Sequence, residues 1–322
     1  MKKKSFVLLL IVALLAVTMF AGCSKSGDDA NGEWPSQTVK IIVPFAAGGS
    51  TDMTFRTLAD QLTEDLGVNF VVENKEGGSG SLGLAEAGNA KPDGYTFGIG
   101  MGSNMCMVPN MSDTGYDAFD FTPVCQVTNT PLALAVNKDL PITTLDEFIE
   151  YAKNNELTYS SSGANNTQQV TMTLLGNKEG FEATHIPQDG APAAVAACMG
   201  GHVDAVMAVA TDLVSAYESD EVRVICLFDK ERISFLSDVP CSAELGHEDL
   251  AYGVWYSLVG PKGLDPAIVD KMEAAVVAAL DSDYVKDAYK KMSVNAVYMN
   301  AEDLAAKIAD YDKVMDEVMA DW

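Results

Sequence analysis

Residues 39–52 read Val-Lys-Ile-Ile-Val-Pro-Phe-Ala-Ala-Gly-Gly-Ser-Thr-Asp, and this stretch decides the class of fold. Its first five residues form a short apolar run that predicts a buried strand, and Pro44 ends the run because proline offers no N–H to a sheet. The Gly48-Gly49 pair predicts a sharp turn with bare backbone. The Ser50-Thr51-Asp52 triplet is typical of a helix start, and apolar residues at helical spacing follow it. The stretch therefore predicts a strand, a turn and a helix in direct succession.

Such a turn has the physical properties of an anion-binding site. The glycines leave backbone N–H groups uncovered, and the first N–H groups of a helix have no intrahelical partners. We therefore predict that a small anion binds here. The alternative is a plain strand-to-helix turn in which Asp52 complements the helix dipole. Because a carboxylate repels a bound anion, we favour a loop-ordering or water-holding role for Asp52 over a direct ligand contact.

The composition limits the classes of partner. The chain has 322 residues, of which 48% are hydrophobic, so it is long enough for one large domain or two medium ones. Its formal net charge of -25 argues against nucleic acid and acidic membrane surfaces as partners. The same charge repels an anionic ligand at long range, so an anion site must rely on local donors.

The N-terminus has the pattern of an export signal. Three lysines precede an apolar run that is too short to span a membrane and ends at Ala21-Gly22-Cys23. This ending resembles a bacterial lipobox, which implies that residues 1–22 are removed and that Cys23 is lipidated. Residues 23–33 are polar and predict a flexible tether. We expect an extracytoplasmic protein anchored to the membrane by lipid; the alternative is an ordinary secretory signal with an incidental cysteine.

The remaining cysteines and the histidines do not indicate a redox or metal site. None of the five cysteines after Cys23 belongs to a C-x-x-C pair, so we expect buried free thiols, with one disulfide as the alternative. The three histidines, His185, His202 and His247, are far apart and lack the spacing of metal ligands. We predict no metal and no cofactor.

Predicted strands alternate with predicted helices along the rest of the chain, which indicates an α/β fold with mostly parallel sheets. The length favours two lobes, and lobes without a flexible linker usually share two crossing strands with a cleft between them. We expect residues 34–131 and 253–322 to form lobe 1 and residues 132–252 to form lobe 2.

A series of short motifs resembles one known family, the substrate-binding proteins of tripartite tricarboxylate transporters, or Bug-type receptors. Each motif is weak alone, and their number and order carry the resemblance, which covers residues 34–322. The matching segments are residues 34–40, 44–52, 71–75, 77–83, 92–96, 116–117, 120–123, 159–163, 185–187, 200–204, 238–240, Trp255 and 260–263.

The resemblance implies a two-lobed periplasmic-binding-protein fold (type II) that takes up a di- or tricarboxylate-like ligand and delivers it to a membrane permease. It implies a monomer that makes and breaks no bond. One carboxylate is expected on the first turn, and the other lobe is expected to supply the second side of the site. The implied ligand-binding residues are Phe45, Ala47, Gly48, Gly49, Ser50, Thr51, Asp52, Ser103, Asn104, Ser161, Ser162, Gly163, Asn165, Thr167, Pro187 and Asp189.

Two segments depart from the family pattern. Many relatives carry an aromatic residue and a lysine where this chain has Gln188-Asp189-Gly190. Relatives often carry Asn or a serine–proline pair where this chain has Ala210-Thr211-Asp212. Both segments are expected near the far end of the ligand, so the identity of the carboxylate stays open.

Other functions have less support. Residues 78–83 match G-x-G-x-x-G, but this pattern alone is a weak sign of dinucleotide binding, and close backbone packing near the cleft is the simpler interpretation. An exported enzyme using Asp52 and Asp189 as acid and base would lack a nucleophile and a metal. A receptor of the same fold that senses its ligand for signalling is the main alternative to transport.

Overall fold

A computed structural model of the protein describes residues 34–320. The predicted signal segment, Cys23 and the rest of the tether predicted over residues 23–33 all lie outside these residues. Residues 37–322 form one compact unit, and the fold below is that of this unit.

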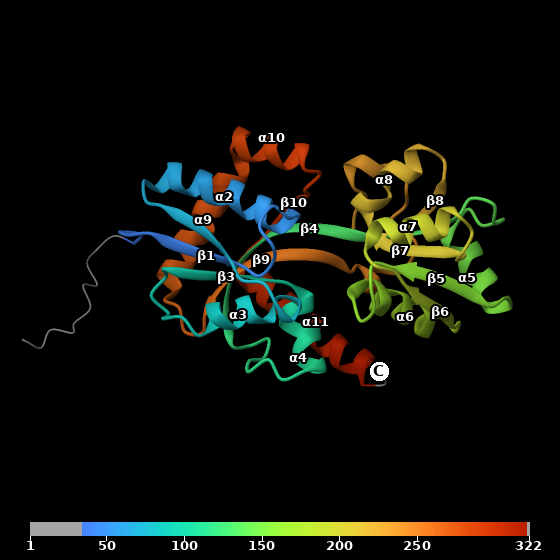
Figure 1. Ribbon diagram of the computed structural model, residues 1–322, viewed down its shortest axis with the longest axis horizontal. Coiled ribbons are helices and arrows are strands. Elements are labelled where there is room, and N and C mark those ends of the chain that lie inside the picture. The colour runs from blue at the N-terminus through green and yellow to red at the C-terminus, as the bar shows by residue number, and fades with distance from the viewer. Residues whose placement is uncertain (1–33, 321–322) are drawn as a thin grey trace, which may run out of the picture. The chain divides into compact units, whose positions relative to one another are not determined.

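The first group of elements, here called lobe 1, is built on three parallel strands (Figure 1). Strand β1 lies between β2 and β3 and is parallel to both, as the apolar run at its centre predicts. Helix α2 follows β1 directly, so the strand–turn–helix prediction is confirmed. The elements are β1 (Val39–Val43), α2 (Ser50–Leu66), β2 (Phe70–Asn74), η1 (Gly78–Gly80), α3 (Ser81–Gly88), β3 (Thr96–Gly100), η2 (Ser103–Met107) and α4 (Val108–Met111).

Two long antiparallel strands, β4 (Phe121–Asn137) and β9 (Gly253–Pro261), run between the two groups. The first part of β4 pairs with β9 as far as Pro131. From Leu132 onward β4 pairs with β7 and β8 instead. The change of partner falls between Pro131 and Leu132. The bounds of the two lobes stay a prediction.

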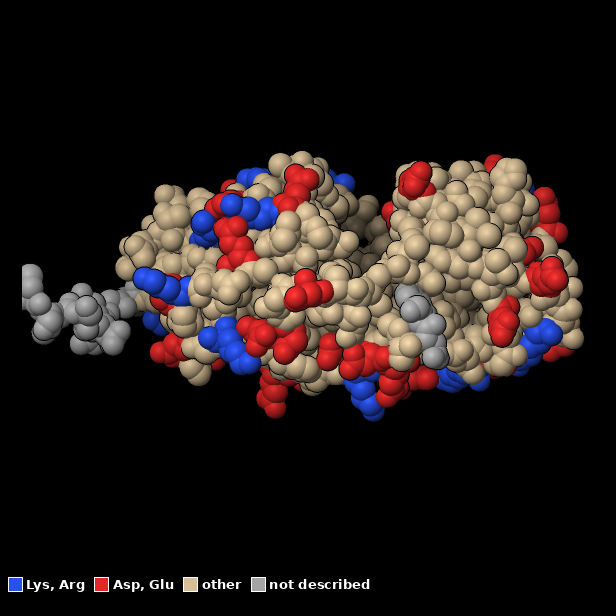
Figure 2. Space-filling view, turned by 60° about the horizontal axis from the view of Figure 1, so that its bottom comes forward, with Lys and Arg blue, Asp and Glu red and all other residues tan. Residues whose placement is uncertain are grey.

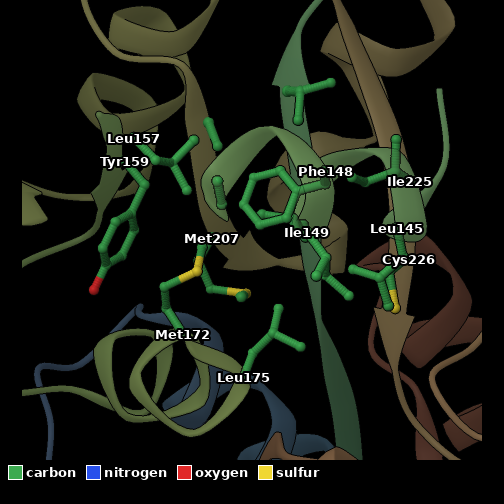
Figure 3. Close-up of a cluster of buried hydrophobic side chains, with 14 of the residues drawn as sticks. Leu145, Phe148, Ile149, Leu157, Tyr159, Met172, Leu175, Met207, Ile225 and Cys226 are labelled. Carbon is green, nitrogen blue, oxygen red and sulfur yellow. The ribbon is translucent and has the colours of Figure 1, made fainter. Parts of the chain in front are cut away.

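The second group, lobe 2, has β5 in parallel pairing with both β6 and β7. Its core lies between this sheet and the helices α5 and α6, where Phe148, Tyr159, Met172 and Met207 pack together (Figure 3). The elements are α5 (Leu145–Asn154), β5 (Leu157–Ser161), α6 (Thr167–Glu179), β6 (Ala183–Pro187), α7 (Ala191–Met199), β7 (Ala205–Val209), α8 (Ala210–Glu218), β8 (Val222–Phe228), η3 (Ser234–Leu236) and η4 (Glu248–Leu250).

The chain then returns through β9 to lobe 1, where it ends in α9 (Pro266–Asp281), α10 (Asp283–Lys291), β10 (Ala296–Met299) and α11 (Ala301–Met319). The α/β class, the parallel strands in each lobe and the crossing pair are as predicted. The first half of β4, the short β10 and the helix α8 were not predicted. Within residues 34–320, none of the helices has the combined length and apolar character needed to cross a membrane.

The surface is hollowed between the two lobes (Figure 2). Asp and Glu side chains are spread along the lower part of the face shown there, with Lys and Arg interspersed. The carboxyl ends of β1 and β3 in lobe 1, and of β5, β6 and β7 in lobe 2, carry the loops predicted to bind the ligand.

Candidate functional site

The turn between β1 and α2 is fixed by one carboxylate. Oxygen Oδ2 of Asp52 accepts hydrogen bonds from the backbone N–H of Gly48 at 2.8 Å and from Nε of Arg56 at 3.0 Å. Its other oxygen, Oδ1, accepts from Nδ2 of Asn74 at 2.8 Å. The Asp52 side chain is only 2% exposed, so its oxygens are used to hold the turn. This is the loop-ordering role that we favoured for Asp52.

The electrostatics of Asp52 agree with this role. Burial raises the pKa of the carboxyl, but hydrogen bonds from Arg56, Gly48 and Asn74, together with the charge of Arg56, outweigh burial and lower it overall. Arg56 also donates to Oδ1 of Asn74 at 2.8 Å, so its guanidinium is engaged on two sides. The negative charge of Asp52 is therefore balanced by Arg56 beneath the turn. Residues 46–50 stay exposed to solvent.

Two neighbouring segments of lobe 1 pack against the turn. A Cβ atom at Gly80 would lie 3.3 Å from both the Phe45 ring and Nδ2 of Asn104, so the backbone at Gly80 brings these segments into close contact. The side chain of Asn104 is fully buried: it accepts from the N–H of Met101 at 2.8 Å and donates to the carbonyl of Ile99 at 3.1 Å. Asn104 thus shapes the wall of the site with its amide already bonded, and half-buried Ser103 begins the same segment.

Tyr256 on β9 belongs to this region and was not among the predicted site residues. Its ring packs edge-on against Phe55 of α2, with 6.4 Å between ring centroids. Sequence alone gave no local sign of this residue, because only the pairing of β9 with β3 and β4 brings it beneath α2.

In lobe 2 the loop after β5 is bonded mainly to itself. The hydroxyl of Ser161 donates to the carbonyl of Gly163 at 2.7 Å and lies 2.8 Å from Nε2 of His185. Because the serine has a single proton, which it gives to Gly163, Nε2 of His185 must be the donor in the second bond. This Ser–His pair therefore lacks the arrangement of a nucleophile and its base.

The rest of this loop is also internally bonded. The hydroxyl of Ser162 accepts from Gln168 at 3.0 Å, and the carbonyl of Gly163 accepts from Asn166 at 3.0 Å. Asn165 is exposed and has a positive φ of 55°, so it forms the tip of the loop. Pro187 and Asp189 are exposed at the carboxyl end of β6 and are the loop's neighbours in the sheet.

Thr167 connects the two lobes. Its hydroxyl lies 3.1 Å from the hydroxyl of Tyr311 on α11 and 3.9 Å from the sulfur of Met107 in η2. The structure thus brings the first residue of α6 against two lobe 1 segments. The binding roles of Thr167 and of the other predicted residues remain predictions.

A cavity of about 1410 Å³ lies on the face of the crossing strands opposite to Tyr256. Trp255 lines it, and since neighbouring residues of a strand point to opposite faces, Tyr256 points away from it. Lys307, also in its lining, donates to Oε1 of Gln126 at 2.7 Å, and burial lowers its pKa to about 8. Acidic residues outnumber basic ones in this lining, so the cavity is less suited to an anion than the turn of lobe 1.

Within residues 34–320, no three His, Cys, Asp or Glu side chains are grouped as a metal site would require. The five cysteines of this region, Cys106, Cys125, Cys198, Cys226 and Cys241, are buried and free, as expected for structural thiols.

Comparison with known proteins assigns the chain to a family. The model of the family described as "Tripartite tricarboxylate transporter family receptor" (TctC) matches residues 54–321. A Cupriavidus necator protein, "UPF0065 protein in gbd 5'region", is 33% identical over 283 residues, which is 86% of this chain and 85% of the relative.

Solved structures lead to the same family. A TctC solute-binding protein from Polaromonas superposes with a TM-score of 0.85 at 28% identity, covering 90% of this chain and 100% of that one. Two Rhodopseudomonas palustris proteins, solved with adipate and with malate, superpose with TM-scores of 0.68 and 0.66 at 28% and 27% identity. They cover 89% and 88% of this chain, and it covers 97% and 99% of them. The chain therefore belongs to the TctC family of periplasmic solute-binding receptors.

Proposed function

We propose that this protein binds a small organic carboxylate between its two lobes and delivers it to a tripartite tricarboxylate-type membrane permease. The observation that carries the proposal is the turn at residues 44–52, where Asp52 holds the backbone from beneath and leaves residues 46–50 exposed at the start of α2. Exposed N–H groups at a helix N-terminus attract a carboxylate without the help of a cationic side chain.

The relatives solved with adipate and with malate support a ligand of this chemical class. The same arrangement explains how a chain with a net charge of -25 holds an anion: the attraction comes from backbone donors in contact with the ligand, and long-range attraction is not needed.

The mechanism we propose is a change in population between open and closed forms. A ligand that touches both lobes stabilises the form in which they are close, and a permease that recognises this form receives only loaded protein. The crossing strands β4 and β9 are the connection about which the lobes would move. Lipidation at Cys23 would keep the loaded protein close to the permease, on the extracytoplasmic side of the membrane.

A thermal-shift screen of the purified full chain tests this proposal. The panel contains mono-, di- and tricarboxylates, amino acids, neutral sugars and divalent metal ions. We expect at least one carboxylate to raise the melting temperature, because a ligand that binds only the native state stabilises it by mass action. Shifts produced by sugars or metal ions alone would overturn the carboxylate proposal.

A further inference from the structure

The two sides of the proposed site have opposite polarity. Lobe 1 presents the exposed turn at the start of α2, which offers hydrogen-bond donors. In lobe 2, β6 and β7 both run parallel to β5, so the residues that follow them lie at the same edge of the sheet. Those residues include Asp189, after β6, and Asp212, in the first turn of α8 after β7.

Asp212 is close to the lobe 1 side of the site. Helices α2 and α8 lie on the same side of the crossing strands, in different lobes (Figure 1). Tyr256 on β9 lies beneath α2, where its ring packs edge-on against Phe55 with 6.4 Å between ring centroids. Burial raises the pKa of its phenol, and the charge of Asp212 adds to this effect.

The Asp212 carboxylate has no partner for its charge. Among residues 34–320, no Lys, Arg or His nitrogen lies within 4.0 Å of it, although its side chain is open to solvent. The surrounding protein nevertheless desolvates the group and raises its pKa. In lobe 1, the guanidinium of Arg56 near the start of α2 is bonded to Asp52 and Asn74, so its charge is already paired there.

We propose that Asp212 selects a ligand whose carboxylate binds the turn of lobe 1 and whose other end carries an ammonium group: an amino carboxylic acid in preference to a dicarboxylate. This inference rests on the proposed function and narrows its ligand class. A second carboxylate placed near Asp212 would be repelled, whereas an ammonium group would pair with it.

Calorimetric titration of the purified full chain at pH 7 tests the inference with length-matched acids that differ only at one end. The pairs are succinate with 3-aminopropanoate, glutarate with 4-aminobutanoate, and adipate with 5-aminopentanoate. For at least one length we expect the amino acid to bind about tenfold more tightly or better, which corresponds to about 1.4 kcal/mol. In the Asp212→Asn variant this preference should fall to about threefold or less, because the charge is removed while the shape is kept.

The matched control is Asp146→Asn. Asp146 is an exposed first-turn acid of another lobe 2 helix, α5. It lies at the other edge of the sheet, since α5 follows β4 and β4 is antiparallel to β7. This variant should keep the preference of the unmodified chain.

Equal or tighter binding of the dicarboxylate at all three lengths would overturn the inference, and so would an unchanged preference in Asp212→Asn. If none of the six acids binds but the wider screen finds another carboxylate, the inference fails unless that ligand carries a cationic group and loses affinity in Asp212→Asn. Failure of every carboxylate in the screen is a separate result, which overturns the proposed function itself.

Discussion

In lobe 1 the turn after β1 is fixed by a side chain from the helix that follows it: Asp52 reaches back to the N–H of Gly48 and leaves the turn exposed. In lobe 2 the loop after β5 is fixed from within, since Ser161 and Asn166 both bond to the carbonyl of Gly163. Both segments follow a parallel strand. In the first, the N–H groups of Gly48 and Gly49 are bonded to Asp52 and to the carbonyl of Ala46, so the donors left for a ligand are the first N–H groups of α2. We infer that lobe 1 provides most of the affinity for a carboxylate and that lobe 2 provides shape and selectivity.

The largest effect should follow from adding a side chain to the lobe 1 turn. A Cβ at Gly49 would lie 3.3 Å from the carbonyl oxygen of Ala46, and the branched methyl groups of valine would occupy space next to the exposed N–H groups. We expect Gly49→Val to weaken binding of the best carboxylate by about 100-fold or more. A loss of this size corresponds to two or more hydrogen bonds to a charged group. Calorimetric titration measures this loss.

Gly49→Ala is the graded control for this variant. It adds only the Cβ, so its affinity should lie between those of the unmodified chain and Gly49→Val, with the melting temperature nearly unchanged in both variants. Unaltered affinity in Gly49→Val would place the site elsewhere and would mean that the lobe 1 turn does not provide most of the affinity.

The second effect concerns stability. Asp52→Ala leaves the N–H of Gly48 without its acceptor and takes from the amide of Asn74 one of its two acceptors, and we expect a loss of about 2 kcal/mol in the free energy of unfolding. This loss is in the lower part of the usual range because Asp52 lies beneath a single loop and the Arg56 side chain is 43% exposed, so solvent screens their ion pair. Asp52→Asn keeps one acceptor oxygen and should lose about half as much.

The pH dependence of this loss follows from the lowered pKa of Asp52. The unfolded chain takes up a proton at a higher pH than the folded chain, so the carboxylate stabilises the fold above the ordinary Asp pKa of 3.8, and this contribution is lost as the pH falls further. Urea unfolding at pH 7 and at pH 3 should therefore show a smaller difference between Asp52→Asn and the unmodified chain at pH 3. An equal difference at both values would mean that the charge of Asp52 is unimportant.

The sequence predicted the lobe 1 turn well because its determinants are local. The apolar run, Pro44, the two glycines and Asp52 all lie within fourteen residues, and each acts through its own backbone preference or through the helix it begins. The α/β class followed from the same kind of local pattern repeated along the chain.

The sequence could not predict Tyr256, His185 or Tyr311 as neighbours of the site, because each reaches it through strand pairing or helix packing over a long distance in the chain. Tyr311 meets Thr167 across 144 positions, and Ser161 meets His185 across 24. Nor could it show that the polar side chains after β5 bond to one another. Serine and asparagine are equally compatible with binding a ligand and with closing a loop.

The smallest effect on binding is expected in lobe 2. Ser161→Ala removes a hydroxyl that is fully buried and bonded to both Gly163 and His185, so it should lower the free energy of unfolding by about 1 to 2 kcal/mol. Binding should weaken by only about threefold, because the hydroxyl holds its own loop and has no free proton for a ligand. Urea unfolding and calorimetric titration of the same preparation measure the two effects.

Ser161→Ala therefore reverses the pattern of Gly49→Val: stability falls and affinity is nearly kept in lobe 2, whereas affinity falls and stability is nearly kept in lobe 1. His185 offers an independent check of the fold around this loop, since burial lowers the pKa of its imidazole. Stability should then fall as the pH drops below the ordinary His pKa of 6.5, where the unfolded chain gains the proton first. If Ser161→Ala instead abolishes binding, the two loops contribute alike to ligand capture, and lobe 2 must hold a carboxylate as directly as lobe 1 does.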